Sequence, residues 1–247
     1  MIRRTALISG GTGGLGTAMC RALADAGHTV VANDLPSLET QCKEWQAKQR
    51  DDGYAFELAF ADVTDYDACA AMVEDLQARV GTVEILVNNA GITRDGVFKK
   101  MSLERWQTVL DASLGGMFNL TRQVFEGMLE GGWGRVINIS SLNGQKGQFG
   151  QANYSAAKAG AHGLTMALAQ EGARNGVTVN SISPGYIGTE MVMAIPEDVR
   201  NSIVAQIPVG RLGEPDEIAH VVRFLTDEKS GFITGANIDI NGGQWMH

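Results

Sequence analysis

The sequence has few cysteines, no long apolar run and no secretory leader. Cys20, Cys42 and Cys69 are widely spaced in 247 residues, so neither a disulfide framework nor a metal-ligand motif is expected, and we predict no metal site. Isolated thiols of this kind are typical of the reducing cytosol, which predicts a cytoplasmic protein. No segment approaches the roughly 20 apolar residues of a membrane span, and the N-terminus lacks the apolar core and cleavage site of a signal peptide.

Basic residues are also in short supply. The chain has 20 Lys and Arg against 28 Asp and Glu, for a formal net charge of −8. This excess argues against nucleic acid or an anionic membrane as a general partner, although a local basic patch for an anionic substrate stays possible. Internal repeats, low-complexity stretches and interdomain linkers are absent as well, so we expect a single domain over residues 1–247.

Apolar strand-like runs alternate with helix-like segments along the whole chain. Strands are predicted at 5–9, 29–33, 55–60, 85–88, 135–139, 177–183 and 237–240. Helices are predicted at 17–26, 37–50, 66–80, 103–128 with a break near Ala112, 153–174, 196–206 and 215–226. Strict alternation with buried strands predicts an α/β fold, in which a parallel sheet is covered on both faces.

A glycine-rich turn lies between the first predicted strand and the first predicted helix. Gly10, Gly14 and Gly16 let the backbone turn sharply and approach a pyrophosphate, to which the helix N-terminus offers unpaired N–H groups. We expect Thr12 and Leu15 of the same turn to contact this cofactor too. The alternative is a tight strand-to-helix turn that binds no ligand.

Asp34, at the end of the second predicted strand, bears on the choice of cofactor. It follows Gly16 by 18 residues, where a carboxylate accepts hydrogen bonds from the adenosine ribose and repels a 2′-phosphate. The turn contains no Lys or Arg, Leu35 follows Asp34, and the nearest downstream base is Lys43. We therefore predict NADH as the preferred cofactor, with NADPH possible. The alternative is that Asp34 only caps the following helix.

Two further strand ends carry polar or small residues. Asp62 and Val63 end the third strand, where a carboxylate could meet the adenine amine, although a plain turn is nearly as good an explanation. Asn88, Asn89, Ala90 and Gly91 end the fourth strand; small residues there let a cofactor lie against the backbone, and the amides could tie neighbouring strands together. We expect Asn89 and Gly91 to contact the cofactor, because ligands bind at the carboxyl edge of such sheets.

Tyr154 and Lys158 are the chemically most informative pair, with Ser141 thirteen residues upstream. A spacing of four on a helix puts the phenol and the ammonium on one face. A cation there is expected to lower the tyrosine pKa from about 10 toward working pH, which suits a group that transfers a proton. The pair alone also occurs on ordinary helix surfaces, so the prediction depends on its combination with the glycine turn and the serine.

These motifs together resemble the short-chain dehydrogenase/reductase family over essentially the whole chain. The matching elements are the Gly10/Gly14/Gly16 turn, Asn88 to Gly91, Ser141, Tyr154 with Lys158, and Pro184-Gly185. The resemblance implies a single-domain Rossmann fold with a seven-stranded, doubly wound parallel sheet, and usually a homotetramer. It also implies hydride transfer between a nicotinamide and a carbonyl or alcohol carbon.

A narrower resemblance concerns residues 143–151, which look like the substrate loop of acetoacetyl-CoA reductases of polyhydroxyalkanoate synthesis. It implies acetoacetyl-CoA and related short 3-oxoacyl-CoA thioesters as substrates. Ser141 would bind the ketone oxygen, Tyr154 would deliver the proton, and Lys158 would bind the nicotinamide ribose. The residues implied to line the acyl pocket are Asp95, Gln148, Phe149, Gln151 and Tyr186, and those implied to bind the cofactor are Pro184, Gly185, Ile187 and Thr189. Taken alone, the 148–151 stretch also fits a polar surface loop. The glycine-broken segment 186–212 is expected to act as a lid.

The chain departs from these relatives at two positions. Reductases of this subfamily commonly use NADPH, whereas Asp34 indicates NADH. The family usually has Asn where this chain has Ser113, which puts a lysine-bound water relay in doubt.

Two alternatives to an acetoacetyl-CoA reductase stay open. One is a 3-oxoacyl-acyl carrier protein reductase, although residues 130–133 lack the basic groups that an acidic carrier needs and only Arg174 is left for docking. The other is a non-catalytic NAD-sensing protein, which would be expected to lose Tyr154 or Lys158. The apolar tail at 244–247 predicts burial in a tetramer interface, or folding back on its own subunit.

Overall fold

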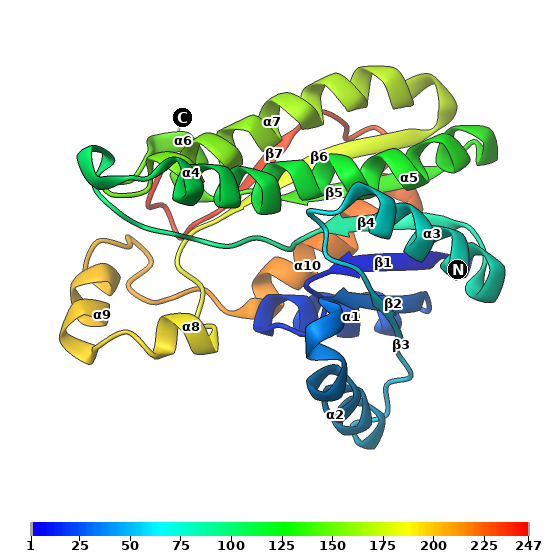
Figure 1. Ribbon diagram of the computed structural model, residues 1–247, viewed down its shortest axis with the longest axis horizontal. Helices are drawn as coiled ribbons and strands as arrows, with labels where there is room; N and C mark the ends of the chain where they lie inside the picture. Colours follow the sequence, from blue (N-terminus) through cyan, green and yellow to red (C-terminus); the bar gives the residue numbers. More distant parts are fainter. Residues whose placement is uncertain (1, 247) are drawn as a thin grey trace.

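Seven strands form one parallel sheet in the order β3-β2-β1-β4-β5-β6-β7 (Figure 1). The computed structural model describes residues 2–246. The strands are β1 Thr5–Ser9, β2 Thr29–Asp34, β3 Glu57–Phe60, β4 Val83–Asn88, β5 Gly134–Ile139, β6 Val177–Pro184 and β7 Asn237–Ile240. From β1 the next strands are added on one side of the sheet (β2, β3), and from β4 they are added on the other (β5, β6, β7). The point between β1 and β4 is the topological switch point, where α/β sheets open a ligand crevice. The predicted α/β fold, with a seven-stranded doubly wound sheet, is confirmed.

Helices cover both faces of the sheet. They are α1 Gly14–Asp25, α2 Glu39–Asp51, α3 Tyr66–Val80, α4 Leu103–Leu110, α5 Gly116–Gly131, α6 Leu142–Lys146, α7 Ala152–Gly172, α8 Glu190–Met193, α9 Glu197–Val204 and α10 Pro215–Thr226. Side chains of α1 and α10 pack on one face, and those of α3, α5 and α7 pack on the other. Within residues 2–246, no helix is both long and apolar enough to cross a membrane.

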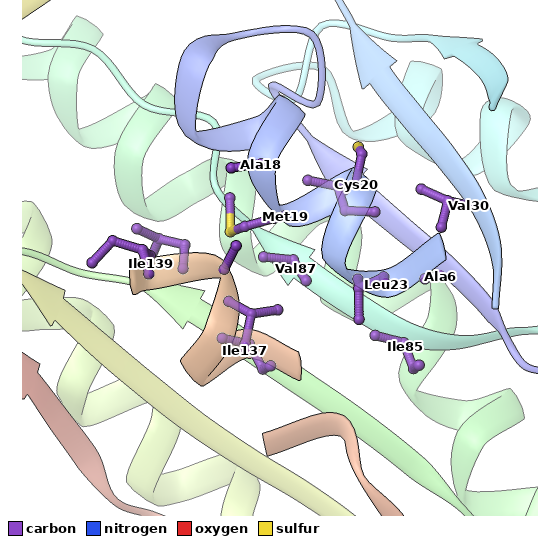
Figure 2. Packing of buried hydrophobic residues seen from close by; sticks show 14 of the residues in the cluster. Ala6, Ala18, Met19, Cys20, Leu23, Val30, Ile85, Val87, Ile137 and Ile139 are labelled. Atoms are coloured by element: carbon purple, nitrogen blue, oxygen red, sulfur yellow. The ribbon is translucent and has the colours of Figure 1, made fainter. Parts of the chain in front are cut away.

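The core explains why the strands read as continuous apolar runs. In β1, Ile8 points into the α1/α10 layer while its neighbour Leu7 points into the α3/α5 layer, and both are fully buried. Figure 2 shows Met19 of α1 near Val87 of β4, and Leu23 of α1 near Ile85 of the same strand, in the first of these layers. A strand covered on both faces needs apolar side chains at every position, so the usual alternation disappears.

Most predicted elements are present with shifted ends, and two short helices were not predicted. The first helix starts at Gly14, earlier than predicted, because its glycines belong to the first turn. The predicted break near Ala112 is confirmed as a π-helical turn, Asp111–Gly115, between α4 and α5. The short helices α6 and α8 were not predicted, since four or five residues give no helical periodicity.

The segment from Tyr186 to Gly213 leaves the sheet and returns to its starting point. Ile187 and Gly213 form an isolated parallel bridge. Gly188 N–H donates to the Gly213 carbonyl at 2.8 Å, and Gly213 N–H donates to the Tyr186 carbonyl at 2.9 Å. Helices α8 and α9 stand out from the sheet between these ends (Figure 1). This is the segment expected to act as a lid, and its movement stays a prediction.

Candidate active site

The predicted site residues gather at one edge of the sheet because the strands are parallel. Ser9, Asp34, Asn88, Ile139 and Pro184 are the last residues of β1, β2, β4, β5 and β6. The glycine turn, Gly91, Ser141 and Gly185 come shortly after these ends. This is the edge of the sheet nearest α6 and α8, toward the left of Figure 1. The carboxyl edge therefore brings together groups that are more than 150 residues apart in sequence.

The glycine turn forms a cradle for an anionic cofactor. Gly10 has a φ of 61°, in the left-handed region, and a Cβ on Gly16 would lie 2.1 Å from the Gly10 carbonyl oxygen. A Cβ on Gly14 would instead lie 3.6 Å from Thr189, on the far side of the turn. The N-cap of α1 is Gly13, which has no side chain to satisfy the first N–H groups of the helix. These donors fit the pyrophosphate of a dinucleotide.

Asp34 does not cap a helix, so that alternative is wrong. The N-caps of the two following helical segments are Leu35 and Leu38. The Asp34 carboxylate instead accepts hydrogen bonds from Leu35 N–H at 3.0 Å and from the Thr12 hydroxyl at 2.5 Å. The carboxylate thus sits beside the glycine turn, where an adenosine ribose would lie.

The other predicted cofactor residues at β3 and β4 have structural partners of their own. Asn89 Nδ2 donates to the carbonyls of Ser9 and Gly10 at 2.9 and 3.1 Å, which fixes the glycine turn on β4. Asp62 Oδ1 accepts from the backbone and hydroxyl of Thr64, as a turn residue does. The Val63 side chain is buried in the core. Their contacts with a cofactor stay predictions.

The amide pair at the end of β4 ties strands together, as the sequence suggested. Asn88 Nδ2 donates to Asn138 Oδ1 of β5 at 2.8 Å and to the Thr121 hydroxyl of α5 at 2.9 Å. A side chain that links two strands and a helix holds the switch point of the sheet rigid.

Ser141 lies at the start of α6, and Tyr154 and Lys158 lie in the neighbouring helix α7. Ser141 is the N-cap of α6 and accepts from Asn143 N–H at 3.1 Å. Tyr154 is in the first turn of α7, and Lys158 follows one turn later. The ammonium lies 5.7 Å from the centre of the Tyr154 ring and donates to the Ile139 carbonyl at 2.7 Å. The spacing-based prediction of a shared face is confirmed.

The pKa of Tyr154 is raised, so the predicted lowering is wrong. Burial raises the pKa of Tyr154, a hydrogen bond with Ser141 opposes that shift, and the negative charge of Asp95 adds to it. Burial also lowers the pKa of Lys158 to about 8. The ammonium is directed to the Ile139 carbonyl rather than to the phenol, so Tyr154 is held as a proton donor at neutral pH.

Ser113 lies close to Lys158 but its hydroxyl is already engaged. It is completely buried in the π-helical turn, accepts from Ile92 N–H at 3.3 Å and donates to the Ile92 carbonyl at 3.4 Å. A Cβ on Gly91 would lie 3.2 Å from the Ser113 oxygen and 3.4 Å from the Lys158 nitrogen. The Ser113 hydroxyl and the Lys158 ammonium therefore both lie next to Gly91.

The predicted substrate residues come from two loops that contact each other. Gln151 Nε2 donates to Asp95 Oδ2 at 2.9 Å, and Gly96 N–H donates to the Gly150 carbonyl at 2.8 Å. Gln148 accepts from Lys146 at 2.9 Å, and Phe149 is 87% exposed, as an apolar group at the mouth of a site would be.

Two asparagines that the sequence did not single out hold these loops. Asn143 Nδ2 donates to Gln151 Oε1 at 2.9 Å, so both ends of the Gln151 amide are engaged. The buried Asn153 donates to the carbonyls of Arg94 and Arg105, each at 3.1 Å. Their proximity to Ser141 and Tyr154 in sequence was the available signal, but their partners depend on the tertiary structure.

The remaining predicted residues line the end of β6. Gly185 is required there because a Cβ would lie 2.9 Å from the Cα of Asn241. Ile187 is buried in the core and Tyr186 is half-buried at the base of the 186–213 segment. Thr189 is the N-cap of α8, opposite the glycine turn. Across residues 2–246, no group of three His, Cys, Asp or Glu side chains is arranged to hold a metal.

Comparison with known proteins decides the family. The sequence profile of the short chain dehydrogenases matches residues 4–200. The chain belongs to this family. It is 55% identical over 244 residues to the acetoacetyl-CoA reductase of Allochromatium vinosum, covering 99% of both chains. It is 52% identical over 246 residues to that of Cupriavidus necator, covering 100% of both. A 3-oxoacyl-[acyl-carrier-protein] reductase of Vibrio cholerae is 39% identical over 243 residues, covering 98% of both.

Family membership makes the protein an oxidoreductase that acts on a keto or hydroxyl group with a nicotinamide dinucleotide. When bound, that dinucleotide supplies or takes up the two electrons. The chain itself provides an anion cradle in the glycine turn, a carboxylate beside it, and a protonated phenol that is hydrogen-bonded to a serine.

Proposed function

We propose that this protein is an acetoacetyl-CoA reductase that uses NADH and forms (R)-3-hydroxybutyryl-CoA. The observation that carries the proposal is the full-length identity of 55% and 52% to two acetoacetyl-CoA reductases. The single domain spans residues 1–247, with a lid at 186–212, and the enzyme works as a homotetramer in the cytoplasm.

The geometry of the carboxyl edge supports the following catalytic roles. The Ser141 hydroxyl hydrogen-bonds the ketone oxygen, where negative charge develops. Tyr154 gives its proton to that oxygen, and its raised pKa keeps the proton available. Lys158 turns from the Ile139 carbonyl to the ribose hydroxyls of the nicotinamide half.

The acyl thioester enters between the two contacting loops. Gln148 and Gln151 offer amides to the thioester and its β-keto group, with Asp95 holding Gln151 in place. Phe149 and Tyr186 provide apolar contact at the mouth. Asn143 and Asn153 brace these loops.

The preference for NADH is supported by Asp34 and by the absence of Lys and Arg from residues 9–16. A 2′-phosphate would face the negative charge of Asp34, and like charges at close range cost several kcal/mol, or roughly 100-fold in binding. The test is kcat/KM for NADH and NADPH with acetoacetyl-CoA. Equal values, or higher values with NADPH, contradict the cofactor assignment.

A carrier-protein substrate is the second candidate, because of the 39% identical reductase. Basic residues are needed to dock an acidic carrier, but residues 130–133 are Glu-Gly-Gly-Trp and leave only Arg174 nearby. Acetoacetyl-CoA and the acetoacetyl carrier-protein thioester, each assayed with NADH, separate the two. Faster turnover of the carrier-protein thioester overturns the coenzyme A assignment, and no acyl-dependent NADH oxidation with either substrate indicates a non-catalytic NAD-binding protein.

A further inference from the structure

Three side chains form a hydrogen-bonded chain beside the glycine turn. The Thr12 hydroxyl lies 2.5 Å from Asp34 Oδ2 and 3.8 Å from the Sγ of Cys42, which projects from α2. Cys42 is 1% exposed, whereas Thr12 and Asp34 are half-buried at the carboxyl edge of the sheet. The three groups come from the β1–α1 turn, the end of β2 and α2, so the contact exists only in the folded protein.

Hydrogen-bond chemistry fixes the direction of this chain. An ionised carboxylate only accepts, so the single hydroxyl proton of Thr12 is donated to Asp34. The Thr12 oxygen is then left as an acceptor, and the proton between it and Cys42 comes from the thiol. Burial and the charge of Asp34 both raise the pKa of Cys42, although its hydrogen bond with Thr12 opposes them, and the thiol therefore keeps this proton.

The Asp34 carboxylate can still accept further hydrogen bonds. A carboxylate offers about four acceptor positions on its two oxygens. Leu35 N–H takes one position on Oδ1 and Thr12 takes one on Oδ2. One position stays on each oxygen, which matches the two neighbouring hydroxyls of an unmodified ribose. A 2′-phosphate in place of one hydroxyl supplies acceptors instead of donors.

We infer that Thr12, backed by Cys42, is a positioning residue that orients Asp34 and thereby selects NADH over NADPH. In this role Thr12 acts through the carboxylate, in place of the direct cofactor contact that the sequence predicted. The inference rests on the NADH preference proposed above and extends it to two side chains with a defined mechanism. It is independent of the acyl substrate.

Binding of NADH and NADPH to the tetrameric protein without acyl substrate tests this role, using the fluorescence of the reduced nicotinamide. Thr12→Val keeps the shape of the side chain and removes the donor. We expect NADH affinity to fall about 3- to 10-fold, because an Asp34 side chain that Thr12 no longer holds must be ordered by the cofactor itself, with NADPH affinity changed by less than about twofold. Thr12→Ser should restore the parent ratio of the two affinities. Cys42→Ala should lower NADH affinity about two- to threefold, and Cys42→Ser should restore it.

Two further variants separate positioning from direct contact and from a loosened turn. In an Asp34→Ala background, adding Thr12→Val should change NADH affinity by less than about 1.5-fold, because residues that act through one another are not additive. Thr17→Val is the matched control, since its hydroxyl donates to the Thr12 carbonyl at 3.3 Å and accepts from Trp45 without touching Asp34. It should leave the NADH/NADPH ratio within about twofold of the parent.

The outcomes also separate this inference from the proposed function. A Thr12→Val ratio equal to the parent's, or an equal loss in the Asp34→Ala background, overturns the inference while the reductase assignment stands. Equal affinity of the parent for both cofactors overturns the inference and the NADH preference together. A parent that discriminates through Thr12 but does not reduce acetoacetyl-CoA overturns the substrate assignment alone.

Discussion

At the scale of single residues, Tyr154 and Lys158 have shifted pKa values for the same reason. Both are placed in the interior of the site, and burial disfavours the charged form of each, so the phenol keeps its proton and the ammonium gives one up more easily. The ammonium of Lys158 is held on the Ile139 carbonyl. The pair is therefore arranged to donate a proton, which is the direction that ketone reduction needs.

Replacing Tyr154 with Phe removes that proton while keeping the ring. We expect kcat to fall on the order of 10²- to 10⁴-fold, the usual contribution of a positioned acid, with NADH affinity nearly unchanged. Ser113→Ala is the comparison, because its hydroxyl bonds Ile92 rather than the catalytic groups and should cost less than about tenfold. Steady-state rates of NADH oxidation measure both. A Tyr154→Phe rate within about threefold of the parent would remove Tyr154 from the mechanism.

The lowered pKa of Lys158 predicts a pH limit on the reductase. Lys158 carries its charge below about pH 8 and loses it above, so kcat/KM, which reports the free enzyme, should fall as the pH rises through that region. Lys158→Arg keeps the charge at every accessible pH and should abolish this fall in kcat/KM even if the rate is lower. A kcat/KM profile that stays flat to about pH 10 in the parent contradicts the shift.

At the scale of elements, the site depends on how closely α6 approaches α7. A Cβ on Gly144 of α6 would lie 2.8 Å from the Lys158 carbonyl carbon and 2.9 Å from Ala159 N. Both are backbone atoms, which cannot rotate away. Gly144 thus sets the distance between the helix that starts at Ser141 and the helix that carries Tyr154 and Lys158.

Gly144→Ala should push these helices apart. Overpacking of this kind costs roughly 1–3 kcal/mol of stability, and small misplacements of catalytic groups cost up to about 100-fold in rate. Denaturant unfolding and kcat measure the two effects. Gly163→Ala is the control, because it lies on α7, the helix that Gly144 contacts, and nothing lies within 4 Å of its added Cβ. Parent-like stability and rate for Gly144→Ala would show that α6 is free to shift.

Sequence patterns predicted those elements whose stability is local or periodic. The strands and the long helices have continuous or repeating apolar positions, and the break near Ala112 was visible as an interruption of that pattern. Helices α6 and α8 are too short for periodicity. Tertiary contacts decided the rest. The Thr12–Asp34 and Asn143–Gln151 hydrogen bonds join separate elements, and the direction of the Tyr154 pKa shift came from burial and from Asp95, which the Tyr-x-x-x-Lys spacing does not report.

At the scale of the whole molecule, the protomer leaves large apolar groups in water. Leu103 of α4 is 79% exposed and Phe118 of α5 is 52% exposed, with Tyr66 stacked on Phe118. Near the end of the chain, Met246 is 77% exposed, although Trp245 turns back so that its carbonyl accepts from Asn241. His247, the last residue of the predicted interface segment, lies outside the described residues. Exposed groups of this size mark association surfaces.

We therefore expect a homotetramer with a mass of about four times 26.4 kDa by light scattering. One interface should contain α4, α5 and α7, and the other the C-terminal segment. Because α7 carries Tyr154 and Lys158, dilution to the monomer should lower kcat. A monomer with the full rate at assay concentration contradicts both the assembly and its contribution to the site.

The paired ends of the 186–213 segment have a consequence for how this enzyme can change. Backbone hydrogen bonds between Tyr186, Gly188 and Gly213 hold the two ends together, and Val209 N–H donates to the Gly242 carbonyl as a further tie to the rest of the chain. Closing a longer loop on such fixed ends costs only about 0.6 kcal/mol for each doubling of its length. We therefore expect that residues 190–206 can be lengthened, shortened or exchanged while the sheet and Thr189 stay in place. The fold leaves substrate size open to variation in one continuous stretch of chain.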